Sequence, residues 1–303
     1  MSLLSRYLET ISSDQTCRAY DADLQRFFGK RDLDESDVER IDPDAIQSVI
    51  RSMSRDGKAL STQQRRLSAL RGFFDWLIQN GFVSRNPARH PQVEPLRPKA
   101  EMSSSATLSK ANVEKMIEVA GESARSGLRD QALILTIVYG ALRRREIASL
   151  EVDHVRPLGG YWILDLDPIA KSSGYVRIPE TVVEAIERVK DRYGITKGRL
   201  WRSVSNQNRG APMTADAVYK VVRCVSHQAG LKPVSIDTLR QAGLQIALEG
   251  GASVPQVQAH GRLADSATAA RLYDSEHSSG TLSDSPVECI DLDAEKIPSG
   301  GQY

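Results

Sequence analysis

The chain has 303 residues, of which 40% are hydrophobic and 26% are charged, and its formal net charge is +1. These values are ordinary for a soluble globular protein, and the length favours two domains. The longest apolar stretch, Ala132 to Leu142, is far shorter than the ~20 residues that span a bilayer, and the N-terminus lacks a signal-peptide pattern. We therefore expect a cytoplasmic protein that makes no membrane contact.

Basic and acidic residues are unevenly distributed along the chain. Residues 51–100 contain ten lysines and arginines against three acidic residues, whereas residues 274–303 contain seven acidic residues against one lysine. A basic body with an acidic tail indicates a polyanionic partner. The three cysteines, Cys17, Cys224 and Cys289, match no CxxC or zinc pattern, so we expect reduced thiols and no metal site.

Residues 1–90 are predicted to form a helical domain. Residues 15–28 carry aromatic and apolar side chains at helical spacing, and Asp42 followed by Pro43 is typical of a helix start. A longer helix is expected over residues 61–80, because its apolar side chains fall on one face. Three arginines, Arg65, Arg66 and Arg71, project from the rest of that helix.

The second half of the chain is predicted to mix helices with a few strands. Residues 91–107 contain three prolines and three serines without periodicity, which favours a linker. Strands are expected at 161–166 and 175–178, joined by a turn that carries Lys171. Helices are expected at 109–120, 128–141, 180–193, 214–229, 236–249 and 254–260. The predicted fold class is therefore mainly α with a small antiparallel β-sheet.

These patterns divide the chain into four parts. We expect a helical domain over 1–90, a linker over 91–107, an α+β domain over 108–275 and an acidic, flexible tail over 276–303. Within the tail, the stretch from Val287 to Leu292 is the one segment expected to order if a partner is present, and plain disorder is the simpler expectation.

Sequence motifs exclude several common chemistries. We find no Walker phosphate loop, no HExxH pair and no hydrolase triad order. What remains is a spaced set of side chains, each of which is ordinary when taken alone: an arginine at a helix end is usually solvated or paired, and a tyrosine usually packs. The set consists of Arg143, Lys171, Arg240, His260 and Tyr273.

The order and context of this set carry a family resemblance. Residues 138–150, VYGALRRREIASL, run from an apolar helix through a bend to an arginine, with a glutamate three residues later. Here the sequence resembles the tyrosine recombinase (phage integrase) family, whose first arginine box is roughly G-L-R-x-S-E-[LI]-x-x-L. Ala141 replaces the usual glycine and Arg145 the usual serine. The matching residues are Leu142, Arg143, Glu146, Ile147 and Leu150.

The resemblance extends over roughly residues 5–275. Lys171 and Pro179 have the spacing of the family's hairpin lysine and the proline after its second strand. The stretch DTLRQ resembles the second box, H-x-L-R-H, and retains its arginine as Arg240. The run T-A-A-R-L-Y, ending at Tyr273, resembles the nucleophile segment, and the N-terminal helices resemble the family's core-binding (SAM-like) domain.

Two histidine positions depart from the family pattern. The histidine of the second box is Asp237 here. The later histidine has no clean match: counting forward from Gly261 gives Arg262, counting back from Tyr273 gives Leu263 or Ala264, and His260 lies close by. These departures bear on activity more than on fold.

The resemblance implies site-specific DNA strand exchange through a covalent 3′-phosphotyrosine intermediate. Tyr273 is the implied nucleophile, and Arg143 and Arg240 are implied to hold the non-bridging oxygens of the phosphate. Lys171 is the implied general acid, and Asp237 or His260 would accept the tyrosine proton. The resemblance implies no metal, ATP or other cofactor.

Double-stranded DNA is the implied partner, bound by a tetramer on two DNA sites in association with the nucleoid. We predict that Arg65, Arg66 and Arg71 contact DNA phosphates; a merely solvated helix face is the alternative. A catalytically weakened or inactive relative that binds DNA as an architectural protein is the second hypothesis. A topoisomerase-like activity and an unrelated helical protein are the remaining alternatives. The sequence leaves open integration, excision, resolution and transposition by a mobile element.

Overall fold

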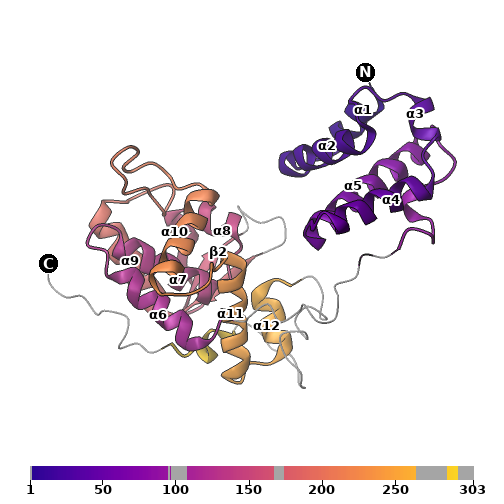
Figure 1. Cartoon of the computed structure of the whole chain (residues 1–303). Coiled ribbons are helices and arrows are strands. Elements are labelled where there is room, and N and C mark those ends of the chain that lie inside the picture. The colour runs from indigo at the N-terminus through magenta and orange to yellow at the C-terminus, as the bar shows by residue number, and fades with distance from the viewer. Residues whose placement is uncertain (1, 95, 97–107, 167–173, 264–284, 293–303) are drawn as a thin grey trace. The chain divides into compact units, whose positions relative to one another are not determined.

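The computed structural model describes residues 2–94, 96, 108–166, 174–263 and 285–292. The chain divides into two compact units, Met1–Ser105 and Ala106–Tyr303 (Figure 1). The fold is mainly helical with a small antiparallel sheet, which confirms the predicted fold class. The positions of the predicted linker at 91–107 and of the other domain boundaries stay predictions. In the described residues, no helix is both long and apolar enough to cross a membrane.

The N-terminal unit is a helical bundle built around helix α5. Tyr7, Phe28, Phe73 and Trp76 form an aromatic cluster at its centre, with the Tyr7 and Phe73 ring centroids 5.3 Å apart. The predicted helix start at Asp42 is confirmed, because its side chain accepts a hydrogen bond from the backbone N–H of Ala45 at 2.7 Å. The elements are α1 (Leu3–Glu9), α2 (Asp14–Phe28), α3 (Glu35–Glu39), α4 (Pro43–Arg55), α5 (Leu60–Gln79) and the 3₁₀ helix η1 (Pro87–Arg89).

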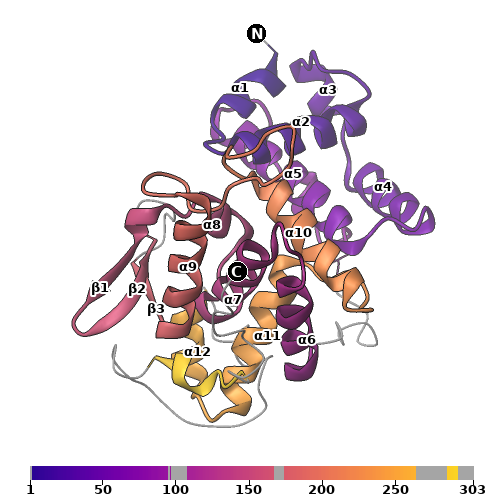
Figure 2. The same cartoon turned by 90° about the vertical axis from the view of Figure 1, so that its left-hand side faces the viewer.

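The C-terminal unit is organised around α7, a helix that is buried along almost its whole length. Helices α6, α9 and α11 pack against it, with the sheet to one side of α9 (Figure 2). The helices are α6 (Lys110–Gly121), α7 (Gly127–Gly140), α8 (Arg144–Ser149), α9 (Glu180–Tyr193), α10 (Ala215–Gln228), α11 (Ile236–Glu249) and α12 (Val254–Gly261), with 3₁₀ helices η3 (Val152–His154) and η5 (Pro286–Cys289).

Glycine permits the close crossing of α7 and α11. A Cβ atom added at Gly243 would lie 2.3 Å from the backbone oxygen of Val138. Any larger residue would push these helices apart, because cores are packed at near-crystalline density. This crossing matters because α7 and α11 both contribute to the site described below.

The sheet has the order β1-β2-β3 and is antiparallel throughout. Strands β2 (Tyr161–Asp165) and β3 (Tyr175–Ile178) confirm the two predicted strands. Strand β1 (Val155–Leu158) was not predicted, because Pro157 breaks the expected strand pattern. Its place at the sheet edge explains why a proline is tolerated there.

Part of the predicted tail packs on the C-terminal unit. Helix η5 packs against α11 and α12, and Val287, Ile290 and Leu292 are buried there. A Cβ atom at Gly250 would lie 2.1 Å from the backbone oxygen of Cys289, so the glycine allows this contact. The apolar side chains of residues 285–292 therefore pack on their own unit, and flexibility of the tail stays a prediction.

Candidate active site

The carboxyl end of α7 collects side chains from three distant parts of the sequence. The last carbonyls of a helix lack partners within it, and its dipole favours cations there. His260 Nε2 donates to the backbone oxygen of Tyr139 at 2.7 Å. Arg240 Nε and Arg262 Nη2 each donate to the backbone oxygen of Ala141, both at 2.9 Å. These bonds place two guanidinium groups at one helix end.

A left-handed residue places Arg143 beside this helix end. Ala141 ends α7 with a φ of 44° and turns the chain, and Arg143 then caps α8. Arg143 Nη1 donates to Glu146 Oε1 at 2.9 Å, and its Nη2 donates to the backbone oxygen of Arg262 at 2.5 Å. The Arg143 side chain nevertheless remains 38% exposed. It is thus held on both terminal nitrogens and still reaches solvent.

Arg240 is held more deeply. It lies in the second turn of α11 and is 8% exposed. Besides its bond to Ala141, its Nη2 donates to the backbone oxygen of Gly261. Burial, reinforced by the charges of Arg143 and Arg262, lowers the pKa of Arg240 to about 10. The guanidinium therefore remains charged at neutral pH.

One buried carboxylate faces these three arginines. Glu146 is 4% exposed and bonds to Arg143 and to Arg262, whose Nη2 lies 2.8 Å from Glu146 Oε2. Burial alone would raise the pKa of Glu146, but Arg262 and Arg143 outweigh it and hold that pKa below its ordinary value. Three guanidinium groups against one carboxylate leave excess positive charge, which suits an anion.

His260 is buried rather than open to a ligand. It is 6% exposed, and burial lowers its pKa to about 4, so the ring is neutral at neutral pH. Because a carbonyl oxygen accepts only, Nε2 carries the proton of the bond to Tyr139. Asp237, in contrast, is exposed in the first turn of α11, three residues before Arg240.

The structure brings together some of the predicted catalytic residues. Arg143, Arg240 and His260 meet at the end of α7, and Asp237 shares α11 with Arg240. Lys171 and Tyr273 lie outside the described residues. Arg262 was considered only as one of several alternatives for the second histidine, yet it is a full member of the cluster.

The three predicted DNA-binding arginines make contacts within their own unit. Arg65 Nη1 lies 2.8 Å from Asp23 Oδ2, and Arg66 Nε lies 3.5 Å from Asp23 Oδ1. The Asp23 side chain is 1% exposed, whereas that of Arg65 is 41% exposed. Arg71 Nε donates to the backbone oxygen of Ala88 at 3.1 Å. Arg65 therefore has the most exposed side chain of the three arginines.

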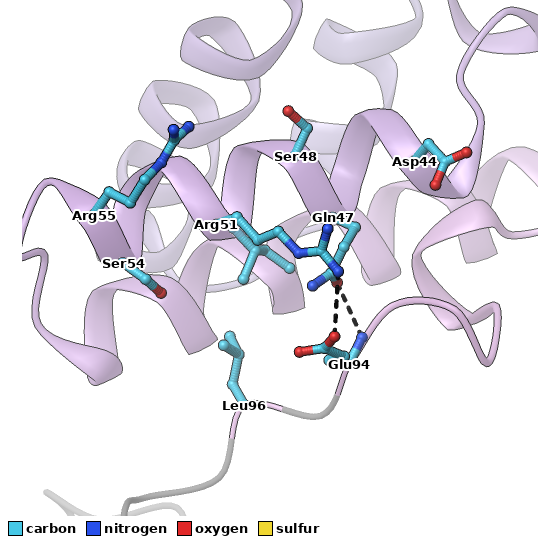
Figure 3. Close-up of a pocket in the computed structure, with 9 residues that line it drawn as sticks. Asp44, Gln47, Ser48, Arg51, Ser54, Arg55, Glu94 and Leu96 are labelled. Atoms are coloured by element: carbon cyan, nitrogen blue, oxygen red, sulfur yellow. Dashed lines mark hydrogen bonds and ion pairs between the residues drawn. The ribbon is translucent and has the colours of Figure 1, made fainter.

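A cavity of about 720 Å³ lies on the N-terminal unit, beside α4 (Figure 3). Arg51 Nη2 donates to Glu94 Oε1 at 3.3 Å, and the backbone N–H of Glu94 donates to Gln47 Oε1 at 3.0 Å. The wall thus pairs a cation with an anion and offers little net charge. Its lining is Asp44, Gln47, Ser48, Ile50, Arg51, Ser54, Arg55, Glu94 and Leu96. We assign no catalytic or binding role to this cavity.

Within the described ranges, no group of three or more histidine, cysteine or acidic side chains gathers as metal ligands.

Comparisons with known proteins match both units. A family model described as the phage integrase N-terminal SAM-like domain matches residues 4–81, and one described as the phage integrase family matches residues 106–278. The chain is 30% identical over 263 residues to tyrosine recombinase XerD of Pseudomonas putida, covering 83% of this chain and 84% of the relative. It is 28% identical over 250 residues to tyrosine recombinase XerC of Pelobacter propionicus, covering 81% and 80%.

Solved structures show the same fold. A lambda integrase fragment, crystallised as a dimer bound to a COC′ core site, superposes with a TM-score of 0.69 at 18% identity, covering 92% of this chain and 98% of the fragment. The Tn1549 transposon integrase in complex with transposon right end DNA gives a TM-score of 0.67 at 15% identity, covering 93% and 97%.

Proposed function

The chain belongs to the phage integrase family, and we propose that it is a site-specific DNA recombinase that cuts and rejoins DNA through a covalent 3′-phosphotyrosine. The observation that carries this proposal is the meeting of Arg143 and Arg240 at the end of α7. The two residues come from different helices, and each is fixed by protein acceptors. Such preorganised cations stabilise the charge that develops on a phosphate in the transition state.

Each arginine has a part of its guanidinium left over for a ligand. Within the described residues, Arg143 Nε and Arg240 Nη1 donate to no protein acceptor, and each bonded terminal nitrogen carries a second hydrogen. Both guanidiniums are planar forks suited to phosphate oxygens. We infer that they bind the two non-bridging oxygens of the scissile phosphate.

The bond changes follow from this arrangement and from the family's chemistry. The Tyr273 hydroxyl oxygen attacks phosphorus, and the bond from phosphorus to the 5′ oxygen breaks. Lys171 gives its proton to that leaving oxygen. The DNA 3′ end stays on Tyr273 as a phosphodiester, and a second 5′ hydroxyl reverses the step. Because the phosphotyrosine conserves the energy of the phosphodiester bond, the scheme needs no ATP. In this scheme Arg143 and Arg240 supply the positive charge at the phosphate, so no metal takes part.

Asp237 is our choice for the acceptor of the tyrosine proton. His260 is the other candidate, but its ring is buried and its Nε2 is committed to Tyr139. Asp237 is exposed and stands one turn before Arg240. A carboxylate is a weaker base than an imidazole, so we expect a slower attack than a histidine would support.

The partner is proposed to be double-stranded DNA, bound by a tetramer on two sites in association with the nucleoid. One solved structure of similar fold is a lambda integrase tetramer bound to a Holliday junction, with a TM-score of 0.64. Phosphate contacts from residues 51–100, including Arg65, would supply most of the affinity for DNA.

The segment from Val287 to Leu292 packs on its own unit. Deleting residues 280–303 tests whether this segment also contributes to assembly of the tetramer. Unchanged assembly on DNA would exclude that role.

A nicked duplex from the DNA that flanks the gene tests the proposed function. After cleavage near a nick the short product diffuses away, and the covalent complex is trapped. We expect detergent-resistant attachment with the wild type and none with Tyr273→Phe. A gel shift with both proteins serves as the binding control. A wild-type protein that binds the duplex but does not become attached to it would contradict the proposal.

The alternative is a DNA-binding relative that does not cut. The observations that favour it are the aspartate at position 237 and the buried state of His260. It predicts a salt-dependent gel shift without attachment, even on the nicked duplex. The two hypotheses share the fold and the DNA partner and differ in whether Tyr273 becomes attached to DNA. The trapping assay therefore separates them.

A further inference from the structure

Arg262 adopts a backbone conformation that residues other than glycine avoid. It ends α12 with a φ of 51° and ψ of 47°. Among the described non-glycine residues, Ala141 is the other one with a positive φ, and it lies in the same site. Strained residues persist where the surrounding structure holds them, and they cluster at functional sites. The strained conformation therefore suggests that the contacts of the Arg262 side chain and carbonyl have a function.

The side chain ties three helices together. Arg262 Nη1 donates to the backbone oxygen of His260 in α12 at 2.9 Å. Its Nη2 donates to the backbone oxygen of Ala141 after α7 and to Glu146 Oε2 in α8, at 2.9 and 2.8 Å. The side chain is 7% exposed. Because it is buried and both terminal nitrogens have protein acceptors, it is poorly placed to bind a ligand itself.

Arg262 instead fixes Arg143 from two sides. Its own backbone oxygen accepts the bond from Arg143 Nη2. Its side chain holds Glu146, and the same carboxylate accepts bonds from the backbone N–H and the Nη1 of Arg143, at 2.7 and 2.9 Å. Both terminal nitrogens of Arg143 thus end on atoms that Arg262 supplies or holds.

We propose that Arg262 is a positioning residue that directs Arg143 toward the scissile phosphate without touching that phosphate. This inference rests on the proposed function. Electrostatic stabilisation depends on donors already aimed at the developing charge, so a guanidinium free to turn would lose most of its effect. A purely structural role in the core is the competing explanation, and Arg129 provides a control for it.

Arg129 matches Arg262 in burial and bonding but lies at the opposite end of α7. It is 7% exposed, its Nη2 lies 2.6 Å from Asp130 Oδ1, and its Nη1 donates to the backbone oxygen of Arg202 at 3.2 Å. Arg129→Lys and Arg262→Lys therefore make the same chemical change in similar surroundings. A structural role predicts similar losses of stability and of cleavage rate for both variants.

The test measures single-turnover attachment to the nicked duplex for both lysine variants and for Arg262→Gly. Glycine suits the positive φ, so the Arg262→Gly variant removes the guanidinium without backbone strain. We expect Arg262→Gly and Arg262→Lys to lower the rate about 10²-fold, and Arg129→Lys to leave it unchanged. Urea unfolding of each variant shows whether stability differs between them.

A double-mutant cycle with Arg143→Lys isolates the route of the effect. If Arg262 acts through Arg143, adding Arg262→Gly to Arg143→Lys should lower the rate less than about 3-fold further. Additive losses, or an equal loss of rate in Arg129→Lys, would overturn the proposal.

The affinity of the same proteins for the duplex separates this inference from the proposed function. If the wild type binds but does not attach, the recombinase proposal fails. The double-mutant cycle is then judged on the Kd for the duplex. Arg143→Lys and Arg262→Gly should each weaken binding about 10-fold, which is the effect of losing one charge-assisted contact. The double variant should bind no more weakly than either single variant. Additive changes in Kd would then overturn the positioning role.

Discussion

Two clusters of arginines in this chain each form around one buried carboxylate, and they differ in how the guanidinium groups are held. In the N-terminal unit, Arg65 and Arg66 approach one buried carboxylate, Asp23. At the end of α7, Arg143, Arg240 and Arg262 share one carboxylate and several backbone carbonyls.

Each cluster sets three arginines against one carboxylate, because Arg26 also lies 4.0 Å from Asp23. At the end of α7, backbone carbonyls orient Arg240 and Arg262 without cancelling their charge. In the N-terminal unit, Arg65 and Arg66 instead lie against Asp23 itself and tie α5 to α2. A count of basic residues does not separate these two cases.

Removing Arg240 should have the largest effect on the rate of attachment to DNA. Arg240→Ala should lower the single-turnover attachment rate by about 10³-fold, because an oriented donor to the phosphate is lost. Arg66→Ala in the other cluster should change the rate less than about 3-fold, because Arg66 lies against Asp23. Rates on the trapped nicked duplex measure both, and similar losses for the two variants would erase the distinction between the clusters.

The pH dependence of stability should come in part from His260. Its folded-state pKa of about 4 is below the ordinary value of 6.5, so the unfolded chain binds the proton first as the pH falls. The stability that neutral His260 contributes is present above about pH 6.5 and is lost as the pH falls toward 4, by about 3 kcal/mol.

His260→Gln should flatten that part of the profile. The amide of glutamine can donate to Tyr139 but does not titrate. Urea unfolding of both proteins between pH 7 and pH 4 gives the difference directly. An unchanged slope in the variant would mean that His260 does not titrate in this range.

The N-terminal cluster should affect stability rather than chemistry. Asp23→Asn removes the buried negative charge that pairs with Arg65 and Arg66, and should lower the free energy of unfolding by about 2 kcal/mol. The DNA cleavage rate under folding conditions should stay within about 2-fold of the wild type. Asp21→Asn, in a more exposed pair with Arg31, is the matched control and should cost less than about 1 kcal/mol.

The smallest expected effect concerns the turn at Ala141. Ala141→Gly should raise the free energy of unfolding by about 1 kcal/mol, because glycine adopts the positive φ of 44° without strain. Ala148→Gly within α8 is the control and should lower it by about 1 kcal/mol. Denaturant midpoints compare the two, and a loss of stability in both would refute strain at Ala141.

Local patterns explain how much of the fold was predictable. The start of α4 follows from Asp42 and Pro43 alone, since a cap and a fixed φ act within a few residues. Strand β1 was missed because its pairing with β2, not its own composition around Pro157, makes it a strand.

The site was predictable where a motif carried it and not where tertiary contacts did. Arg143 and Arg240 were found by their boxes, and the structure brings them to one helix end. Arg262 was named only as one alternative for the second histidine, because its place depends on a left-handed turn that sequence periodicity does not reveal. Likewise, the contacts of Arg65 and Arg66 with Asp23 join two helices that are far apart in the sequence.

We propose that the arginine cluster at the end of α7 acts on a DNA phosphate that is held for attack by Tyr273. The most direct measurement is mass spectrometry of the wild-type protein after trapping on the nicked duplex and digestion with nuclease and protease. We expect a nucleotide adduct on the peptide that contains Tyr273, strongly reduced in the Arg240→Ala protein and absent in the Tyr273→Phe protein. Bound DNA without an adduct, or an adduct on a different residue, would contradict it.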